Sequence, residues 1–308
     1  MACQYPLPRT IDNSMLNCFR TCPQQFYNQY VRRIISKGTS IHLVAGGAFA
    51  RGLEVARRAF HEHKSSVGEA EALGLAALWQ AYGDPVINEK DKKTWDRVSA
   101  AYESYLSTYP LDGDFIQVYH PISGMPCIEF TFCVPLPDVL HPVTAEPILL
   151  SGRADWIGQY ETMPFIVDEK TTGSFSFTWA DSWDLWAQFS TYVYAARYYG
   201  IPVKGSIVRG TAILKEEIQH KQAIIYQPEW KLDRWYEQTC RDLNRMIQAW
   251  IEDYWDFNLG DSCKSYGGCP YAELCKRQNP EPWISIYYEE NTWNPLQKTS
   301  PFLLAEVE

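Results

Sequence analysis

Two neighbouring strand-like stretches constrain what this chain can fold into more than any other feature. Residues 149–160 start apolar and carry one acidic residue, Asp155, in their middle. Residues 165–170 start with three apolar side chains and end in a charged run that begins at Asp168. A hairpin between the two stretches, with its turn near residues 161–164, brings Asp155 beside Asp168. We therefore expect a β-sheet that carries charged side chains among its apolar ones.

The charged run divides between the two faces of its strand. Side chains alternate along a strand, so Asp168 and Lys170 share one face and Glu169 lies on the other. Neighbouring carboxylates such as Asp155 and Asp168 repel each other unless a proton or a cation lies between them. Oxygen ligands favour Mg²⁺, which typically uses one or two carboxylates plus substrate phosphates. A lysine beside them can orient water or stabilise charge on a phosphate. The alternative is a solvated strand end, because charge clusters are common there.

A helix is expected to follow over residues 184–199, with Gly200 as a fitting residue just beyond its end. This helix carries Gln188 and Tyr192. The ordered set of residues resembles the PD-(D/E)XK nuclease superfamily and, within it, the RecB/AddB-type and CRISPR-associated RecB-like exonucleases. The matches are Gly152 and Asp155 for the first motif, Asp168-Glu169-Lys170 for the D/E-x-K motif, and Gln188-x-x-x-Tyr192 for the helical Q-x-x-x-Y motif.

The resemblance implies a fold and a set of residue roles. The fold is an α/β, restriction-endonuclease-like core in which helices flank a mixed central sheet. Asp155 and Asp168 would bind Mg²⁺ or Mn²⁺ through their side chains, and Glu169 would bind it through its backbone carbonyl. Lys170 would be the catalytic lysine. Gln188 and Tyr192 would line the site and contact DNA.

Residues 44–63 resemble a further motif of the same family, G-x-x-x-H-x-x-L-E. Gly46, Leu53 and Glu54 fit this motif, but Ala50 stands at the histidine position. The departure removes one expected metal ligand. Glu54 lies one turn beyond Ala50 on the same helix face, which makes Glu54 a candidate replacement.

Four cysteines form a second candidate site. Cys263, Cys269 and Cys275 follow one another at C-x5-C-x5-C spacing. A closed tetrahedral site needs a fourth soft ligand, and Cys22 is a candidate. One early and three late cysteines resemble the RecB-like nucleases, in which a structural 4Fe-4S cluster ties the C-terminal segment back onto the N-terminal helix. Zn²⁺ is the competing occupant, and unliganded cysteines are the remaining alternative.

We expect a single nuclease domain over residues 1–308. It would contain a helical insertion at residues 65–110 and a C-terminal cluster segment at residues 261–277, which packs on a helix at residues 14–32. Ser14 is the expected N-cap of that helix. The long helix opened by Pro228 is expected to reach about residue 257.

Two other segments bear on the site. Residues 114–136 contain a half-buried strand pattern, whose Glu129 either reaches the site or faces outward as an ordinary strand residue. The loop over residues 171–184 is rich in serine and aromatic residues. Its Phe175, Phe177 or Trp179 either stacks on a base or packs within the fold.

The net charge of −9 argues against a general nucleic-acid-coating protein. It does not exclude a nuclease, because bound metal offsets acidic residues locally. Three basic patches are candidates for phosphate contact, with solvated helix faces as the alternative: Arg32-Arg33 with Lys37, Arg51 with Arg57-Arg58, and Lys90 to Arg97. No apolar run is long enough for a membrane span, and the N-terminus resembles neither a secretory signal nor a transit peptide. The cytoplasm is expected, or the host cytoplasm if a phage encodes the protein.

The expected function is metal-dependent hydrolysis of DNA phosphodiester bonds. The resemblance favours an exonuclease that acts on DNA ends or single strands in recombination, repair or phage replication. No P-loop such as G-x-x-x-x-G-K-[ST] occurs, so ATP-driven unwinding would need a partner such as a helicase. Two rivals remain: a catalytically inactive DNA-binding module and a structural subunit of a nuclease complex.

Overall fold

The computed structural model describes residues 2–37, 41–85, 92–121, 124–264, 268–291 and 293–294 of the 308-residue chain. The chain forms two compact units, each assembled from separate stretches of sequence. Unit 1 comprises residues 1–38, 132–152 and 232–308, and unit 2 comprises residues 39–131 and 153–231. Within the described ranges, no helix combines the length and apolar character that crossing a membrane requires.

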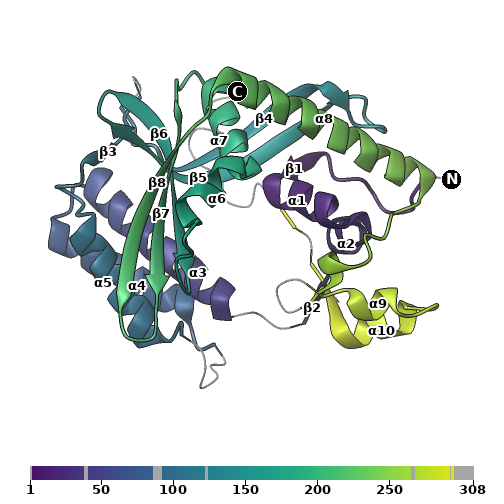
Figure 1. Cartoon of the computed structure of the whole chain (residues 1–308), viewed down its shortest axis with the longest axis horizontal. Coiled ribbons are helices and arrows are strands. Elements are labelled where there is room, and N and C mark those ends of the chain that lie inside the picture. Colours follow the sequence, from purple (N-terminus) through teal and green to yellow (C-terminus); the bar gives the residue numbers. More distant parts are fainter. Residues whose placement is uncertain are drawn as a thin grey trace. The chain divides into compact units, whose positions relative to one another are not determined.

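Unit 2 is built on a mixed β-sheet (Figure 1). Its strands are β3 (Ile116–Val118), the second part of β5 (Pro147–Tyr160), β6 (Met163–Thr172), β7 (Gly205–Ile213) and β8 (Ile218–Tyr226). β5 pairs antiparallel with β3 and β6, β6 pairs parallel with β7, and β7 pairs antiparallel with β8. The mixed sheet with flanking helices confirms the α/β fold that the resemblance implied.

The hairpin that the sequence predicted is the join between β5 and β6. Trp156 pairs with Val167, and Tyr160 pairs with Met163. Glu161 in the turn has a φ of 55°, in the left-handed region that tight turns use. This register places Asp155 next to Asp168, as the sequence analysis expected.

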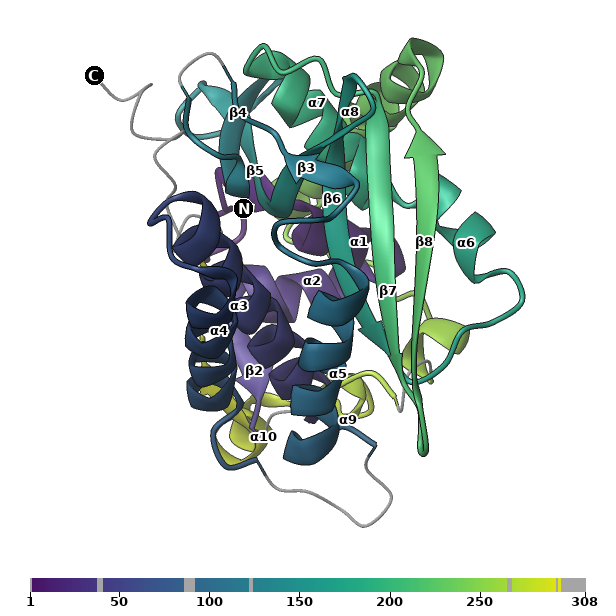
Figure 2. The same ribbon diagram turned by 90° about the vertical axis from the view of Figure 1, so that its left-hand side faces the viewer.

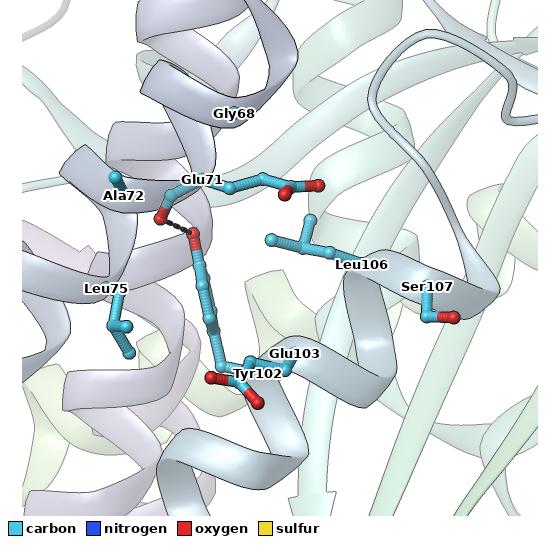
Figure 3. A pocket seen from close by; sticks show the side chains of 8 residues that line it. All are labelled: Gly68, Glu71, Ala72, Leu75, Tyr102, Glu103, Leu106 and Ser107. Atoms are coloured by element: carbon cyan, nitrogen blue, oxygen red, sulfur yellow. Dashed lines mark hydrogen bonds between the residues drawn. The ribbon is translucent and has the colours of Figure 1, made fainter.

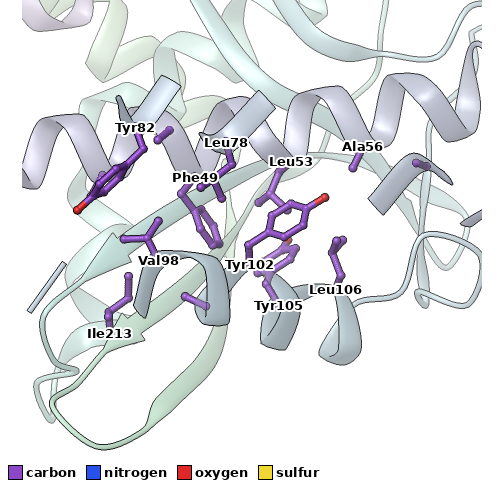
Figure 4. Packing of buried hydrophobic residues seen from close by; sticks show 14 of the residues in the cluster. Phe49, Leu53, Ala56, Leu78, Tyr82, Val98, Tyr102, Tyr105, Leu106 and Ile213 are labelled. Atoms are coloured by element: carbon purple, nitrogen blue, oxygen red, sulfur yellow. The ribbon is translucent and has the colours of Figure 1, made fainter. Parts of the chain in front are cut away.

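Three helices pack over one face of the sheet in unit 2 (Figure 2). They are α3 (Ile41–His61), α4 (Val67–Tyr82) and α5 (Trp95–Thr108). Figure 4 shows the buried cluster that joins them, which includes Phe49, Leu53, Leu78 and Tyr102 of the helices and Ile213 of β7. α4 and α5 lie within the segment for which helices were expected.

Glycines allow α3 and α4 to cross closely. A Cβ atom on Gly74 would lie 2.7 Å from the backbone oxygen of Gly52 and 2.9 Å from the Cβ atom of Ala56. A Cβ atom on Gly52 would lie 3.1 Å from the backbone oxygen of Gly74. Small residues at the crossing therefore set the distance between the two helices.

The helix expected over residues 184–199 is shorter than predicted. A short helix α6 (Trp179–Ser182) and a 3₁₀ turn η2 (Trp183–Leu185) precede α7 (Ala187–Tyr198). Trp186 between them has φ −79° and ψ 117°, an extended conformation that separates the turn from α7. Gly200 has a φ of 78°, so its predicted place just beyond the helix end is confirmed.

Unit 1 contains helices from both chain ends and two small strand pairings. β1 (Thr10–Asp12) pairs parallel with the first part of β5, and β2 (Ile34–Ser36) pairs antiparallel with β9 (Tyr288–Glu290). Its other elements are α1 (Asn13–Thr21), α2 (Pro23–Phe26), the π-helix η1 (Tyr27–Val31), α8 (Glu229–Glu252), η3 (Asp261–Cys263), α9 (Ala272–Cys275) and α10 (Glu281–Tyr287). β4 (Ile128–Leu140), like β5, has residues in both units.

The single helix predicted over residues 14–32 was wrong. Cys22 has φ −162° and ψ 113° and interrupts the helix, because a residue before a proline disfavours the helical region. The N-cap is Asp12 rather than Ser14, since the Met15 amide donates to Asp12 Oδ1 at 2.8 Å. α8 ends at residue 252, before the predicted 257, and the pairing of β9 with β2 gives the tail a structure that its sequence pattern did not indicate.

Candidate active site

The six residues predicted to be catalytic all belong to unit 2. β5 carries Asp155, β6 carries the run from Asp168 to Lys170, and α7 carries Gln188 and Tyr192. Asp155 Oδ2 accepts a hydrogen bond from the backbone amide of Glu169 at 2.6 Å. The first motif and the D/E-x-K motif are therefore in direct contact, as predicted.

Asp168 is the residue at which the remaining motifs meet. Its Oδ2 atom lies 2.6 Å from Lys170 Nζ, which confirms that these side chains share a face of β6. Gln188 Nε2 donates to Asp168 Oδ1 at 3.3 Å and to Tyr192 Oη at 2.7 Å. One face of β6 and one face of α7 thus bring Asp168, Lys170, Gln188 and Tyr192 together.

Burial and nearby charges raise the pKa values of Asp155 and Asp168. Burial raises the pKa of Asp155 well above its usual range, and the charge of Asp168 raises it further. Burial also raises the pKa of Asp168, although Lys170 partly offsets that effect. Burial alone would lower the pKa of Lys170, but Asp168 and Asp155 hold it above its usual value. The site therefore favours a proton or a cation between the two carboxylates.

The donor set fits one hard divalent cation that keeps part of its water shell. In the part of the chain that the structure describes, no three His, Cys, Asp or Glu side chains converge as a ready-made metal site. Mg²⁺ does not need such a cage, because it commonly binds one or two carboxylates and completes its shell with water and phosphate oxygens. Asp155 and Asp168 supply such a pair, and the ligand role of the Glu169 carbonyl stays a prediction.

The Glu169 side chain faces away from this pair into a buried ionic network. Arg57 Nη1 donates to Glu169 Oε2 at 2.9 Å, and Trp156 Nε1 donates to Oε1 at 3.3 Å. Tyr105 Oη also donates to Oε1. Burial would raise the pKa of Glu169, but Arg57 more than offsets this and lowers it. Glu169 therefore anchors β6 from the opposite face.

The network corrects one expectation and adds residues that the sequence analysis missed. Arg57 was grouped with Arg51 and Arg58 as a candidate phosphate patch, but its side chain is 7% exposed and pairs with Glu169. Arg209 of β7 is also buried, and its Nη2 atom donates to Asp114 Oδ1 at 2.8 Å. For Arg57, the sequence signal was an arginine among the apolar residues of a helix face. That signal does not show that Glu169 is its partner.

Glu54 does not stand alone at the position left by the missing histidine. It pairs with Arg51 at 2.8 Å and with Arg58 at 3.3 Å. Burial would raise the pKa of Glu54, but these arginines lower it overall. Glu54 is therefore an anionic carboxylate on α3, and its role as a replacement for the ligand lost at Ala50 stays a prediction.

Glu129 and Arg153 form an ion pair on the strands beside the aspartates. Arg153 Nε lies 2.7 Å from Glu129 Oε2. The Glu129 charge contributes to the raised pKa of Asp155, so its carboxylate lies within electrostatic range of the site. Glu129 therefore reaches the site rather than facing outward. The sequence analysis did not identify Arg153.

The aromatic loop before α7 divides into packed and exposed residues. The ring of Trp179 is buried, and it packs edge-on against Phe175 with ring centroids 4.9 Å apart. A Cβ atom on Gly210 would lie 2.3 Å from the Trp179 ring, so this ring lies directly on β7. Phe177, by contrast, is fully exposed. Of the three candidates for stacking on a base, Phe177 is the most exposed, Phe175 is half-buried and Trp179 is buried.

The four predicted cluster cysteines are brought together in unit 1. Cys22, Cys263, Cys269 and Cys275 line one small cavity, together with side chains such as Gln25. Burial raises the pKa of Cys275 to about 11, and the charges of the other three cysteines contribute. Residues 265–267, between Cys263 and Cys269, lie outside the described part. Four thiols around one cavity are the donor set of a four-cysteine metal site, although their present positions do not form a closed one.

A larger hollow in unit 2 lies away from these residues. It has a volume of about 490 Å³ between α4 and α5, and Figure 3 shows its lining, which includes Glu71, Leu75, Tyr102, Glu103 and Leu106. None of the predicted site residues lines it. Its two carboxylates would repel a phosphodiester, so we do not assign the hollow to nucleic-acid binding.

Among three comparisons with known proteins, one matches a family over most of the chain. The model of the PD-(D/E)XK nuclease superfamily matches residues 13–276. No curated protein matches the chain. Among solved structures, SSO0001 is similar at 14% identity and a TM-score of 0.36, over 87% of each chain. A protein from Eubacterium rectale described as a "putative exonuclease" is similar at 12% identity and a TM-score of 0.47, over 84% of this chain and 88% of that one.

The two similar structures are distant. The assignment to a family depends instead on the family model, which matches residues 13–276. Two residues of the family's motifs, Lys170 and Gln188, contact Asp168 directly. The chain belongs to the PD-(D/E)XK nuclease superfamily.

Proposed function

We propose that this protein is a metal-dependent DNA nuclease whose active site consists of Asp155, Asp168 and Lys170, with Gln188 and Tyr192 beside them. One observation carries the proposal: the buried carboxylate of Asp168 adjoins the partly buried carboxylate of Asp155, and the lysine of the same motif lies 2.6 Å from Asp168. Such a pair is costly to keep unless it binds a cation. Two adjacent carboxylates do not stabilise a fold by themselves, whereas metal-dependent phosphodiester hydrolysis uses them to bind the ion.

The roles of the side chains follow from their contacts. Bound Mg²⁺ or Mn²⁺ would polarise the phosphate and lower the pKa of an attacking water. Asp155 and Asp168 would hold the ion, and Lys170 would donate to a phosphate oxygen or orient the water. Gln188 holds the Asp168 carboxylate through Oδ1. Its second partner, Tyr192, keeps the amide in that orientation.

The resemblance to the RecB/AddB-type and CRISPR-associated enzymes supports a narrower proposal. We expect exonuclease action on DNA ends or single strands, in recombination, repair or phage replication. A helicase partner and a location in the cytoplasm, or in the host cytoplasm for a phage protein, belong to the same proposal.

The four cysteines support a structural metal site in unit 1. We propose a 4Fe-4S cluster held by Cys22, Cys263, Cys269 and Cys275, with Zn²⁺ as the competing occupant. The support is that thiols from both ends of the chain line one cavity. Anaerobically purified protein is expected to be brown with visible absorbance. Colourless protein that contains one zinc per chain would overturn the iron–sulfur proposal.

A second candidate function follows from Ala50. In this candidate the protein keeps the fold without the motif histidine and is a catalytically inactive DNA-binding or structural subunit of a nuclease complex. The two functions differ in turnover, because the inactive subunit would bind DNA and leave it intact.

The first experiment is degradation of end-labelled single- and double-stranded DNA with Mg²⁺ or Mn²⁺. Lys170→Ala is expected to slow cleavage by at least about 100-fold, because positioned proton donors and charge stabilisers contribute that much. Lys221→Ala is the matched control, since Lys221 is a lysine of the same unit that lies over the Phe175 ring. Metal-independent cleavage, or equal rates in the wild type and Lys170→Ala, would contradict the proposal. DNA binding without cleavage by the wild type would favour the inactive subunit.

A further inference from the structure

We propose that Arg153 binds a phosphate of the nucleic acid beside the two-aspartate site and that Glu129 holds its guanidinium in place. The inference rests on the proposed nuclease function, because it assigns to the same site a residue that contacts the substrate. It starts from the position of Arg153 in the sheet. Arg153 precedes Asp155 by two residues in β5, so both side chains leave the same face of the strand.

The charge of Arg153 affects ionisable side chains on two helices beside the aspartates. Its positive charge lowers the pKa of Tyr192, against the larger effect of burial, and it also contributes to the lowered pKa of Glu54. Arg153 therefore lies within electrostatic range of both α7 and α3. Phosphate bound between the aspartates and these helices would adjoin its guanidinium.

Exposure distinguishes Arg153 from the buried cations nearby. Its side chain is 33% exposed, whereas those of Arg57 and Arg209 are 7% and 1% exposed. Those two arginines pair with Glu169 and Asp114 inside the fold. Arg153 has both a place at the site and access to solvent.

The ion pair with Glu129 involves the inner nitrogen of the Arg153 guanidinium. The contact runs through Nε, at 2.7 Å from Glu129 Oε2. The terminal nitrogens of an arginine form a planar fork that matches two phosphate oxygens. A carboxylate on Nε restricts the rotation of the side chain, so less conformational entropy is lost when the fork binds.

The backbone at Glu129 indicates that this ion pair is built into the fold. Glu129 has a φ of 53°, which a non-glycine residue in a strand rarely adopts. Its side chain is 8% exposed. Such strain persists where the surrounding structure imposes it, and it is common at functional sites. Here it directs a buried carboxylate at Arg153.

The test is DNA binding in Ca²⁺, measured by fluorescence anisotropy over a range of salt concentrations. The variant is the double substitution Arg153→Gln with Glu129→Gln. It leaves the net charge unchanged and leaves no buried carboxylate without its cation. We expect about tenfold weaker binding, the size of one lost charge-assisted contact. The slope of log Kd against log salt should fall by about 0.7 for single strands or about 0.9 for duplex, which is the value for one phosphate.

Two further variants and a melting curve complete the design. Arg241→Gln on α8 removes an arginine that is 70% exposed and pairs with Glu237, and it should keep the wild-type slope. Arg153→Lys keeps the charge but not the fork, and it should restore the slope while recovering only part of the affinity. Thermal melting confirms that each variant is folded.

The outcomes separate this inference from the proposed function. A wild type that cleaves DNA, with an unchanged slope in the double variant, would overturn the role of Arg153 and leave the nuclease in place. A wild type that neither binds nor cleaves DNA would overturn both. A lower slope in the double variant together with wild-type behaviour in Arg241→Gln supports the phosphate contact.

Discussion

Asp155 and Asp168 show at the scale of single residues how function opposes stability. The buried carboxylate of Asp168 lies beside the partly buried one of Asp155, and loss of solvation followed by mutual repulsion raises the pKa of Asp155. The folded protein therefore binds a proton at Asp155 more tightly than the unfolded chain does. Because the pKa of Asp155 is higher in the folded protein, proton binding at Asp155 contributes its full stabilisation below the usual carboxyl pKa. It is lost as pH rises through the folded value.

We predict that Asp155→Asn stabilises the metal-free protein and flattens this loss of stability with rising pH. Each 1 kcal/mol of relieved repulsion should raise the melting temperature by about 2–4 °C. The measurement is thermal denaturation in EDTA at several pH values. Mn²⁺ should raise the melting temperature of the wild type but not that of Asp155→Asn. A variant that melts below the wild type in EDTA would show that the carboxylates do not repel each other as described.

Glu169 and Arg57 form a buried ion pair between α3 and β6. Both are buried, and a buried ion pair is strongly destabilised when one partner is removed alone. Arg57→Met should therefore lower the free energy of unfolding by about 3–5 kcal/mol. Urea denaturation measures this change.

The design has an internal rescue and a control. Adding Glu169→Gln to Arg57→Met removes the unpaired charge and should restore most of the lost stability. Arg58→Met, on the next and partly exposed arginine, should cost less than about 1 kcal/mol. Equal losses in Arg57→Met and Arg58→Met would show that the contact with Glu169 does not stabilise the fold.

At the scale of elements, the crossing of α3 and α4 depends on two glycines. A Cβ atom on Gly74 would lie 2.7 Å from the backbone oxygen of Gly52, and backbone atoms cannot move aside as a flexible side chain can. Gly74→Ala should destabilise unit 2 by about 1–3 kcal/mol, the usual cost of overpacking.

Gly68 in the same helix provides a matched control. A Cβ atom there would meet nothing within 4 Å. Gly68→Ala should therefore be neutral or stabilise the protein by up to about 1 kcal/mol, because alanine favours a helix. Urea denaturation of both variants compares the two glycines. Similar effects at both positions would argue against the close crossing.

At the scale of the whole molecule, unit 1 joins both ends of the chain. Cys22 comes from the first helical region, and three other cysteines around the same cavity come from residues 263–275. A bound cluster would link these segments and stabilise them against separation.

We predict that Cys22→Ser lowers the metal content, the melting temperature and the resistance of the C-terminal segment to proteolysis. The reason is that metal-binding free energy contributes to folding where a metal joins distant segments. Cys240→Ser on α8 is the control, because Cys240 does not line the cavity. Metal content and limited proteolysis are the measurements. Wild-type values in Cys22→Ser would remove that residue from the ligand set.

Sequence reasoning could predict the contacts between candidate site residues that lie close together in the chain. Alternation along β6 separates Asp168 and Lys170 from Glu169 over three consecutive positions, and a short turn brings Asp155 beside them. Spacing of this kind follows from the geometry of a strand, so it can be read without knowing the rest of the fold. The even spacing of Cys263, Cys269 and Cys275 is also local, whereas Cys22 entered the predicted set through the resemblance to the RecB-like nucleases.

Contacts between residues that lie far apart in the chain could not be predicted and were found in the folded structure. Arg57 and Glu169 are separated by 112 positions, and the pairing of β2 with β9 joins residues near both ends. Local periodicity shows that a residue lies on a buried face, but not which side chain meets it there. The break at Cys22, the strained backbone of Glu129 and its ion pair with Arg153 arise from packing that many distant segments impose together, so no short stretch of sequence contains them.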